Sequence, residues 1–479
     1  MTEDQAAEQQ RSLTQALQRA ELSTEELWLR YFGLGGEAGF LDVDAYVHGL
    51  GSLPPLERDV LAHAVNERLD ELTHRAGYSR PFRDSTPRSE PFAALVRLLE
   101  GSELAPPDRL PAVAEAAAAA LGVTITVHLV DYEQRLLRPM AFPGQPNSSA
   151  DPLEVDSTLA GRAYQQVRIF PAHTPDRPRL WVPLLAGAER LGVLEVEVGA
   201  VADLDDPGLR TQCRWLSMLL GHLVTLLSQY GDGVDRTRRP ETRTVNAELI
   251  WSLLPPSTAG VDRFVVSGVQ EPRPQVSGDA FDYALSETSA TLVVLDAAGH
   301  DLRSGLIAAT ALAAHRSARH AGRGLAEQAR AMDETIRRQF GADASATAVL
   351  VDLDLTTGRL RYVNTGHPPP LVLRGGQVVT PLGDGCGPLG FGLGDLRVGE
   401  ETLRPDDWLV LYTDGVTGAV DAEGTPFGEP RLVEFLRREA AAGSPPPETA
   451  RRLVKAVLAH QHGPLRDDAT VLLARWAPP

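Results

Sequence analysis

The sequence is poor in residues on which several protein classes depend. Its 479 residues include two cysteines and one lysine, Lys455. Cys213 and Cys386 cannot form the disulfide framework of a small secreted domain, which favours a cytoplasmic location. With one lysine and no GxxxxGK[ST] segment, a P-loop NTPase is excluded, and a kinase or Schiff-base mechanism is hard to place.

Long apolar runs are also missing. The best candidate, residues 215–227, contains His222 and is shorter than the roughly 20 residues of a membrane helix. The first residues, MTEDQAAEQQRSL, have neither the basic nor the apolar segment of a signal peptide. The net charge of −18 opposes binding to nucleic acid or an anionic membrane, since both are polyanions. We therefore expect a cytoplasmic protein with neither kind of partner.

The composition is that of several globular domains. Hydrophobic residues make up 43% and charged residues 23%, and the length predicts about three domains. Residues 1–80 are expected to be helical, because Ser23 and Glu26 have capping-box spacing and Pro54-Pro55 precedes an apolar stripe at helical intervals. Nothing in this region indicates its role.

The middle of the chain predicts an α/β domain over residues 92–230. The helix LPAVAEAAAAALG precedes the alternating strand VTITVHLVD, and two further strands, RLWVPLLAG and RLGVLEVEV, flank a short turn at residues 187–190. A long amphipathic helix is expected over residues 207–230. This order resembles a GAF domain, a bacterial sensory module, which implies an unidentified small ligand or protein partner. A linker with an entry helix, residues 231–256, would lead into the last domain.

Four acidic clusters mark that last domain, residues 257–479, where apolar strands begin or end. They are Asp279 and Asp282 in SGDAFD, Asp296 ending TLVVLD, Asp414 ending WLVLYTD, and Asp467 and Asp468 before ATVLLARW. Carboxylates at strand ends can converge at one sheet edge, where they would repel one another unless cations neutralised them. Oxygen ligands without a His/Cys cluster favour Mg²⁺ or Mn²⁺ over Zn²⁺. Each cluster alone is weak evidence, since an Asp-Gly pair is usually a turn; the order of all four indicates a metal site.

The four-part pattern resembles the SpoIIE/RsbU-like branch of the type 2C (PPM) protein phosphatases, over residues 247–476. The supporting phrases are IWSLLPPS, YVNTGHPPPLVLRGG, GPLGFG and WLVLYTDGVTGAVDAEGTPFG. The resemblance implies an α+β multidomain chain ending in an α-β-β-α sandwich of two packed, mostly antiparallel sheets. It also implies a site with two ions, in which Asp296 bridges the ions and the backbone carbonyl of Ala297 completes one shell. The implied metal-binding aspartates are Asp279, Asp296, Asp414 and Asp467, with Asp468 as the alternative to Asp467.

Two such ions would activate water rather than a protein nucleophile. They lower the pKa of a bound water from 15.7 towards about 7, so that hydroxide attacks phosphorus in line and the serine or threonine alkoxide leaves. The two cysteines agree with a mechanism that needs no protein nucleophile. A thiolate phosphatase has an arginine six positions after its cysteine, and the residues at that spacing here, 219 and 392, are not arginine. Arg273, six residues before Asp279, is a candidate phosphate contact. Asp301 is an extra carboxylate beside the site that would tune metal affinity or substrate choice.

The sequence leaves other interpretations of the acidic clusters and of the helices open. SGDAFD has some likeness to the GGDEF of diguanylate cyclases, and a pseudophosphatase or ligand-sensing scaffold would need no turnover. For the phosphatase, the resemblance implies a phosphorylated anti-sigma-factor antagonist as substrate, in a partner-switching pathway regulated by the N-terminal sensory region. The helices near residues 207–230 and 242–253 would either pair between two copies, forming a homodimer, or pack on their own domain.

Overall fold

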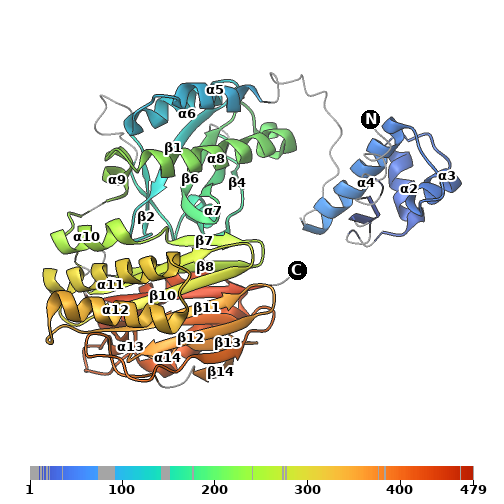
Figure 1. Cartoon of the computed structure of the whole chain (residues 1–479). Coiled ribbons are helices and arrows are strands. Elements are labelled where there is room, and N and C mark those ends of the chain that lie inside the picture. The colour runs from blue at the N-terminus through green and yellow to red at the C-terminus, as the bar shows by residue number, and fades with distance from the viewer. Residues whose placement is uncertain are drawn as a thin grey trace. The chain divides into compact units, whose positions relative to one another are not determined.

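The computed structural model describes ten segments, together with a few single residues between 10 and 20 and at 275. These segments are residues 22–34, 36–73, 92–141, 151–174, 177–239, 241–271, 278–375, 377–381, 385–463 and 465–477. The chain forms two compact units, Met1–Thr86 and Pro87–Pro479 (Figure 1).

The first unit is helical, as predicted. Its helices are α2 (Thr24–Gly33), α3 (Phe40–Val47) and α4 (Pro55–Thr73). The capping box at the start of α2 is present: Glu26 N–H donates to Ser23 Oγ at 3.2 Å, and Ser23 N–H donates to Glu26 Oε2 at 2.9 Å. The sequence did not predict α3, which contributes Val43 and Tyr46 to a core shared with Leu27 and Tyr31 of α2.

The second unit begins with a central domain built on one antiparallel sheet in the order β3-β2-β1-β6-β5-β4. The strands are β1 (Thr124–Val130), β2 (Leu136–Pro139), β3 (Leu153–Glu154), β4 (Phe170–Ala172), β5 (Arg179–Ala186) and β6 (Glu189–Glu197). Helices α5 (Ala93–Ser102), α6 (Leu110–Ala119) and α8 (Pro207–Leu227) contribute to the core on one face, and α7 (Leu159–Gln166) packs on the other. The turn between β5 and β6 is only Gly187-Ala188, and the predicted linker contains a helix, α9 (Gly233–Arg238).

The C-terminal domain stacks two antiparallel sheets. The first sheet has the order β15-β12-β11-β10-β9 and the second β14-β13-β16-β17-β8-β7. The strands are β7 (Thr258–Val261), β8 (Phe264–Glu271), β9 (Asp279–Leu285), β10 (Ser289–Ala297), β11 (Ala346–Asp354), β12 (Arg359–Thr365), β13 (Leu371–Arg374), β14 (Gln377–Pro381), β15 (Gly399–Thr402), β16 (Trp408–Tyr412) and β17 (Ala469–Trp476).

Helices cover the outer face of each sheet (Figure 1). Those on the first sheet are α10 (Val245–Leu253), α11 (Leu302–His320) and α12 (Leu325–Phe340), and those on the second are α14 (Gly428–Ala441) and α15 (Pro446–Gln461). Side-chain alternation in β10 explains the layers: Leu292 and Val294 enter the core between the sheets, whereas Val293 and Leu295 face the helices. Because both faces are covered, TLVVLD has an almost continuous apolar sequence. The predicted α-β-β-α layering is confirmed.

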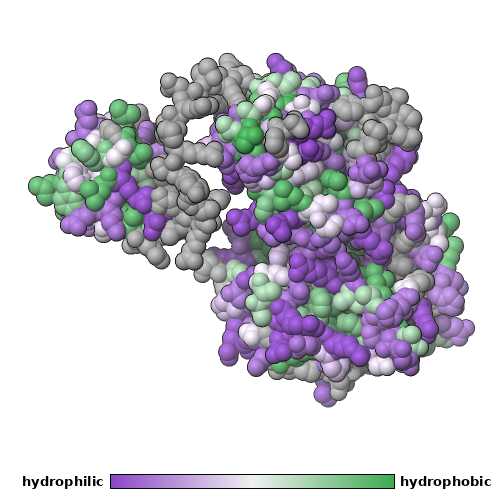
Figure 2. Space-filling model, turned by 180° about the vertical axis from the view of Figure 1, so that it is seen from behind, coloured by the Kyte–Doolittle hydropathy of each residue, from purple (hydrophilic) through white to green (hydrophobic). Residues whose placement is uncertain are grey.

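The surface agrees with the acidic, polar composition. On the face of Pro87–Pro479 drawn in Figure 2, hydrophilic residues predominate, and hydrophobic residues form smaller patches among them. In the part of the chain that the structure describes, no helix is both long and apolar enough to cross a membrane.

Candidate metal centre

The first two predicted ligands face each other across one strand pair. Asp279 is the first residue of β9, and Asp296 lies at the end of β10, directly opposite it in the antiparallel register. SGDAFD precedes the strand of Asp296, as expected, and in addition Asp279 opens a strand of its own that pairs with it. Adjacent residues in such a pair have Cβ atoms about 4.5–5.5 Å apart, which forces two carboxylates together.

The second sheet brings its own aspartates to the same edge. Asp414 follows β16 and begins the short helix α13 (Asp414–Gly418), and Asp467 and Asp468 precede β17. The buried hydroxyl of Thr413 joins the sheets: it donates to Asp279 Oδ2 at 2.7 Å and accepts from Thr470 N–H at 2.9 Å. Thr413 was not predicted from the sequence, although its position directly before a predicted ligand, Asp414, indicated that it could lie at the site.

The structure separates the roles of the neighbouring aspartates 467 and 468. Asp468 is buried, and its Oδ2 accepts from the backbone N–H groups of Gly278 at 2.9 Å and Asp279 at 3.4 Å. Asp467 is exposed and, with Asp414, lines a pocket of about 510 Å³. Asp468 therefore holds the start of β9, while the Asp467 carboxylate is open to the pocket.

Gly278 allows the close approach on which this edge depends. A Cβ there would lie 2.3 Å from the carbonyl oxygen of Ala297 and 3.4 Å from Asp296 Oδ1. The predicted carbonyl ligand and the predicted bridging carboxylate thus lie side by side against residue 278. Any side chain at this position would have to displace backbone atoms of Ala297.

The carboxylates raise one another's pKa. Burial and the charges of Asp296 and Asp468 raise the pKa of Asp279 well above its usual value. Burial and the charges of Asp414, Asp467 and Asp468 raise the pKa of Asp296 to about 7. Burial, followed by the charge of Asp467, also raises the pKa of Asp414. Each of these three carboxyl groups therefore holds its proton more tightly than an isolated aspartate does.

This donor set fits a hard divalent cation in chemistry and charge. All of its side-chain donors are carboxylate oxygens, which Mg²⁺ and Mn²⁺ prefer. Within the described residues, however, no three His, Cys, Asp or Glu side chains are grouped closely enough to hold one ion. Ion binding would therefore require the carboxylates of Asp296, Asp414 and Asp467 to turn towards one another.

Two other acidic residues singled out in the sequence, Asp282 and Asp301, have contacts other than the proposed metal ligands. Asp282 is not part of the edge: it accepts from Arg316 Nε at 3.0 Å and from Arg319 Nη1 at 2.9 Å, which ties β9 to α11. Asp301 caps α11, with Oδ1 accepting from Arg303 N–H at 2.9 Å. Arg273 lies outside the described residues, so its predicted phosphate contact stays a prediction.

The raised pKa of Asp296 predicts how the metal-free protein responds to pH. An aspartate whose folded pKa is about 7 holds its proton more tightly than the unfolded chain, so its contribution to stability decreases as pH rises from about 4 to 7. The asparagine of Asp296→Asn does not titrate, so this variant does not lose stability at residue 296 as the pH rises. In EDTA, the melting temperature of Asp296→Asn relative to wild type should therefore increase from pH 5 to pH 8.

Differential scanning calorimetry across this pH range measures the effect without any need for activity. Asp352→Asn is the control, because Asp352 is paired with Arg361 at the surface. A constant difference between Asp296→Asn and wild type would contradict the crowding of carboxylates at this edge.

Comparison with known proteins shows what the C-terminal part of the chain is similar to. Residues 286–477 match the family model described as Stage II sporulation protein E (SpoIIE). The chain is 29% identical over 149 residues to phosphoserine phosphatase RsbP of Bacillus subtilis, covering 30% of this chain and 37% of RsbP. The chain therefore spans well under half of this relative.

Solved structures also show similarity over less than half of the chain. The RsbU and RsbW domains of a Mycobacterium tuberculosis protein are 29% identical, with 45% of this chain and 62% of that chain covered and a TM-score of 0.39. The SiaA-PP2C domain of Pseudomonas aeruginosa is 28% identical, with 44% and 85% covered and a TM-score of 0.41.

Proposed function

We propose that this chain, whose C-terminal domain is a SpoIIE PP2C-type phosphatase domain, hydrolyses phosphoserine or phosphothreonine on a protein substrate with two Mn²⁺ or Mg²⁺ ions. The observation that carries this proposal is the acidic edge, where Asp279, Asp296, Asp414 and Asp467 come from the ends of strands in two sheets. Such a set suits a phosphate ester, because bound cations would offset the repulsion between carboxylates and an anionic substrate.

Some residues of this edge would bind the ions, and others would orient those ligands. Asp296 would bridge the two positions, with Asp279 on one side and Asp414 and Asp467 on the pocket side. Thr413 holds one oxygen of Asp279 at 2.7 Å, and Asp468 fixes the backbone of Gly278 at 2.9 Å. These outer contacts would orient the ligands. When bound, the ions would lower the pKa of a water molecule towards about 7 and polarise the phosphoryl group.

We further propose that the substrate is an anti-sigma-factor antagonist in a partner-switching pathway. This rests on similarity to RsbP and to the RsbU and RsbW domains, both over only part of this chain. A catalytically silent scaffold remains the second candidate. Against it, every predicted side-chain ligand is an aspartate, and Asp467 and Asp414 are open to the pocket. The cyclase alternative does not explain the family match through ATVLLARW.

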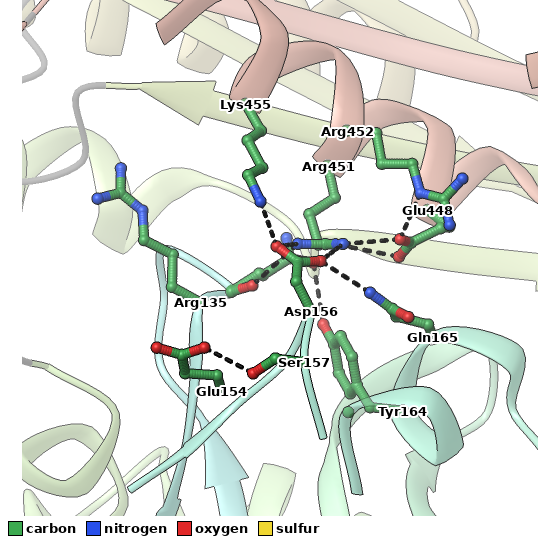
Figure 3. Close-up of polar contacts among 12 residues, drawn as sticks. Arg135, Glu154, Asp156, Ser157, Tyr164, Gln165, Glu448, Arg451, Arg452 and Lys455 are labelled. Carbon is green, nitrogen blue, oxygen red and sulfur yellow. Dashed lines mark hydrogen bonds and ion pairs between the residues drawn. The ribbon is translucent and has the colours of Figure 1, made fainter. Parts of the chain in front are cut away.

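Regulation by the central domain is part of the proposal, and a polar joint between the domains supports it (Figure 3). Asp156 of the central domain accepts from Arg451 Nη2 of α15 at 2.6 Å and from Lys455, the one lysine of the chain. Burial would raise the pKa of Asp156, but these hydrogen bonds lower it to about 2. Because α15 ends at Gln461, six residues before Asp467, movement at the joint would be transmitted to the pocket.

Homodimerisation through α8 is also proposed. Trp215, Met218 and Leu226 are exposed on α8, and the Phe92 ring stacks on Trp215 with centroids 6.0 Å apart. The buried residues of α8, among them Leu216, Leu220 and Val224, fill the core against its own sheet, so one face of α8 packs within the domain and the other is exposed. We expect Trp215→Glu to convert a dimer to a monomer in light scattering. A monomeric wild-type protein would exclude this part of the proposal.

The activity itself is tested with the intact chain. We expect Mn²⁺-dependent release of phosphate from a phosphoserine peptide and from p-nitrophenyl phosphate, and loss of both in EDTA. Phosphate release should continue when Cys386 is blocked with iodoacetamide, since this thiol takes no part, and Cys213 is fully buried and out of reach of the reagent. An inactive wild-type protein that still binds Mn²⁺ in calorimetry would favour the scaffold.

A further inference from the structure

A short loop beside the acidic edge presents an aromatic side chain to solvent. The loop is GPLGFG, residues 387–392, and Phe391 within it is 61% exposed. Gly390 and Gly392, on either side of Phe391, have φ of +100° and +85°, a backbone conformation that L side chains rarely adopt. The backbone is therefore specialised to turn Phe391 outward.

One buried carboxylate holds this turn. Asp333 of α12 is buried, and its Oδ1 accepts from Gly390 N–H at 2.7 Å and Gly392 N–H at 3.0 Å, while Oδ2 accepts from Leu393 N–H at 3.4 Å. Burying a carboxylate is costly unless hydrogen bonds compensate it, so this contact fixes the loop firmly. A large apolar side chain on a rigid loop loses little entropy when it is covered, which suits a binding contact.

The loop adjoins the acidic edge through the sheet. Ala297 pairs with Ala346, and Leu389 exchanges two backbone hydrogen bonds with Ala346, of 2.8 and 3.1 Å. Neighbouring strands are about 4.8 Å apart, so Phe391 lies roughly 10–15 Å from the Asp296 carboxylate. Pro388 packs beside Gly366, two residues before Pro368 of the pocket wall. The loop therefore adjoins the segment that leads into the wall of the pocket with Asp414.

Two further exposed apolar side chains lie on the same side. Leu302 and Leu306, 47% and 43% exposed, are one turn apart at the start of α11. Arg303, between them, donates to Phe340 O at the end of α12, and Arg337 near that end lies within 3.2 Å of a Cβ placed at Gly392. Leu302, Leu306 and Phe391 thus surround the C-terminal end of α12. We call these three residues the rim patch.

We propose that the rim patch binds an apolar side chain of the phosphoprotein substrate, close in sequence to the phosphorylated residue. The proposal rests on the phosphatase function proposed above and adds a substrate preference to it. An extended peptide advances about 3.3 Å per residue, so 10–15 Å corresponds to three to five residues. An apolar side chain three to five positions from the phosphoserine would reach Phe391 while the phosphate lies at the acidic edge.

The test compares two phosphoserine peptides that differ only at these positions, with leucines in one and glycines in the other. For the wild-type chain we expect kcat/KM for the leucine peptide to be higher by about tenfold, the size expected when one apolar side chain is partly covered. Phe391→Ala should abolish that preference and leave hydrolysis of p-nitrophenyl phosphate unchanged, because the dye ester does not reach the loop. Tyr230→Ala is the matched control, an aromatic residue 64% exposed in the central domain.

Binding of the same peptides, carrying fluorescein and read by polarisation, tests the contact independently of turnover. If the wild-type chain neither hydrolyses nor binds the leucine peptide better than the glycine peptide, or if Phe391→Ala keeps the preference, the rim patch is not a substrate contact. If no phosphate is released from any ester while binding follows the leucine preference, the phosphatase proposal fails and the rim contact stands.

Discussion

Asp296→Asn is expected to lower phosphatase activity by more than about 100-fold, because loss of a residue that merely orients a ligand already costs 10–100-fold. Asp296 lies opposite Asp279 in the β9–β10 register and is within reach of the charges of Asp414, Asp467 and Asp468. Four other carboxylates of the edge therefore lie opposite Asp296 or act on its pKa. Removing its charge would therefore weaken both proposed ion positions at once, which phosphate release at saturating Mn²⁺ measures.

The neighbouring aspartates provide a control within the same loop. Asp467→Asn removes an open carboxylate of the pocket and should lose activity as severely as Asp296→Asn. Asp468→Asn keeps an amide oxygen that can accept from Gly278 N–H, so its loss should stay within the 10–100-fold range. Calorimetric titration with Mn²⁺ separates lost binding from lost turnover. The reverse ranking, with Asp468→Asn the more severe, would identify Asp468 as the ligand.

The sequence predicted most of the sandwich because its strands are marked by unusual patterns. WLVLYTD and TLVVLD are apolar on both faces, which is expected only for strands covered on both sides. The small helix α3 was missed because FLDVDAYV is short and its start, at Gly39, has no capping side chain. Helix α9 was not predicted because GDGVDRTRR has the polar composition of a loop. Helical propensity is also a weak guide in such a short segment.

The candidate site was harder to predict, because its detail depends on pairings far apart in the sequence. Four aspartates could be proposed from strand ends, but the choice between 467 and 468 depends on Gly278, about 190 residues away in the chain. The link from Thr413 to Asp279 likewise spans 134 residues. No local pattern gives such contacts. Asp301 was attributed to the site from its position, whereas the local rule for helix caps already explained it.

The second large effect is expected at the joint between the central and C-terminal domains. Glu448 of α15 is buried and accepts from Arg190 Nη1 of β6 at 3.1 Å, from Arg451 Nη2 at 2.8 Å and from Arg452 Nε at 2.9 Å. Burial alone would raise the pKa of Glu448, but Arg451 and Arg190 hold it below its usual value. Glu448→Gln removes the carboxylate that pairs with the buried guanidinium group of Arg190, whereas Arg451 keeps its contact with Asp156. The free energy of unfolding of Pro87–Pro479 should decrease by about 3–5 kcal/mol, measured by urea denaturation of the intact chain.

A matched ion pair at the surface shows whether burial causes the predicted decrease in the free energy of unfolding. Glu400 pairs with Arg359 at 2.7 Å, but the side chains are 52% and 58% exposed, so Glu400→Gln should cost less than about 1 kcal/mol. A double-mutant cycle with Glu448→Gln and Arg190→Met isolates the bond between the domains, and neighbours in one network commonly couple by 0.5–3 kcal/mol. A coupling energy near zero would mean that α15 is stabilised within its own domain. In that case the Arg190–Glu448 bond would not transmit changes in the central domain to α15, and regulation would have to act through Asp156 with Arg451 and Lys455 or through α10.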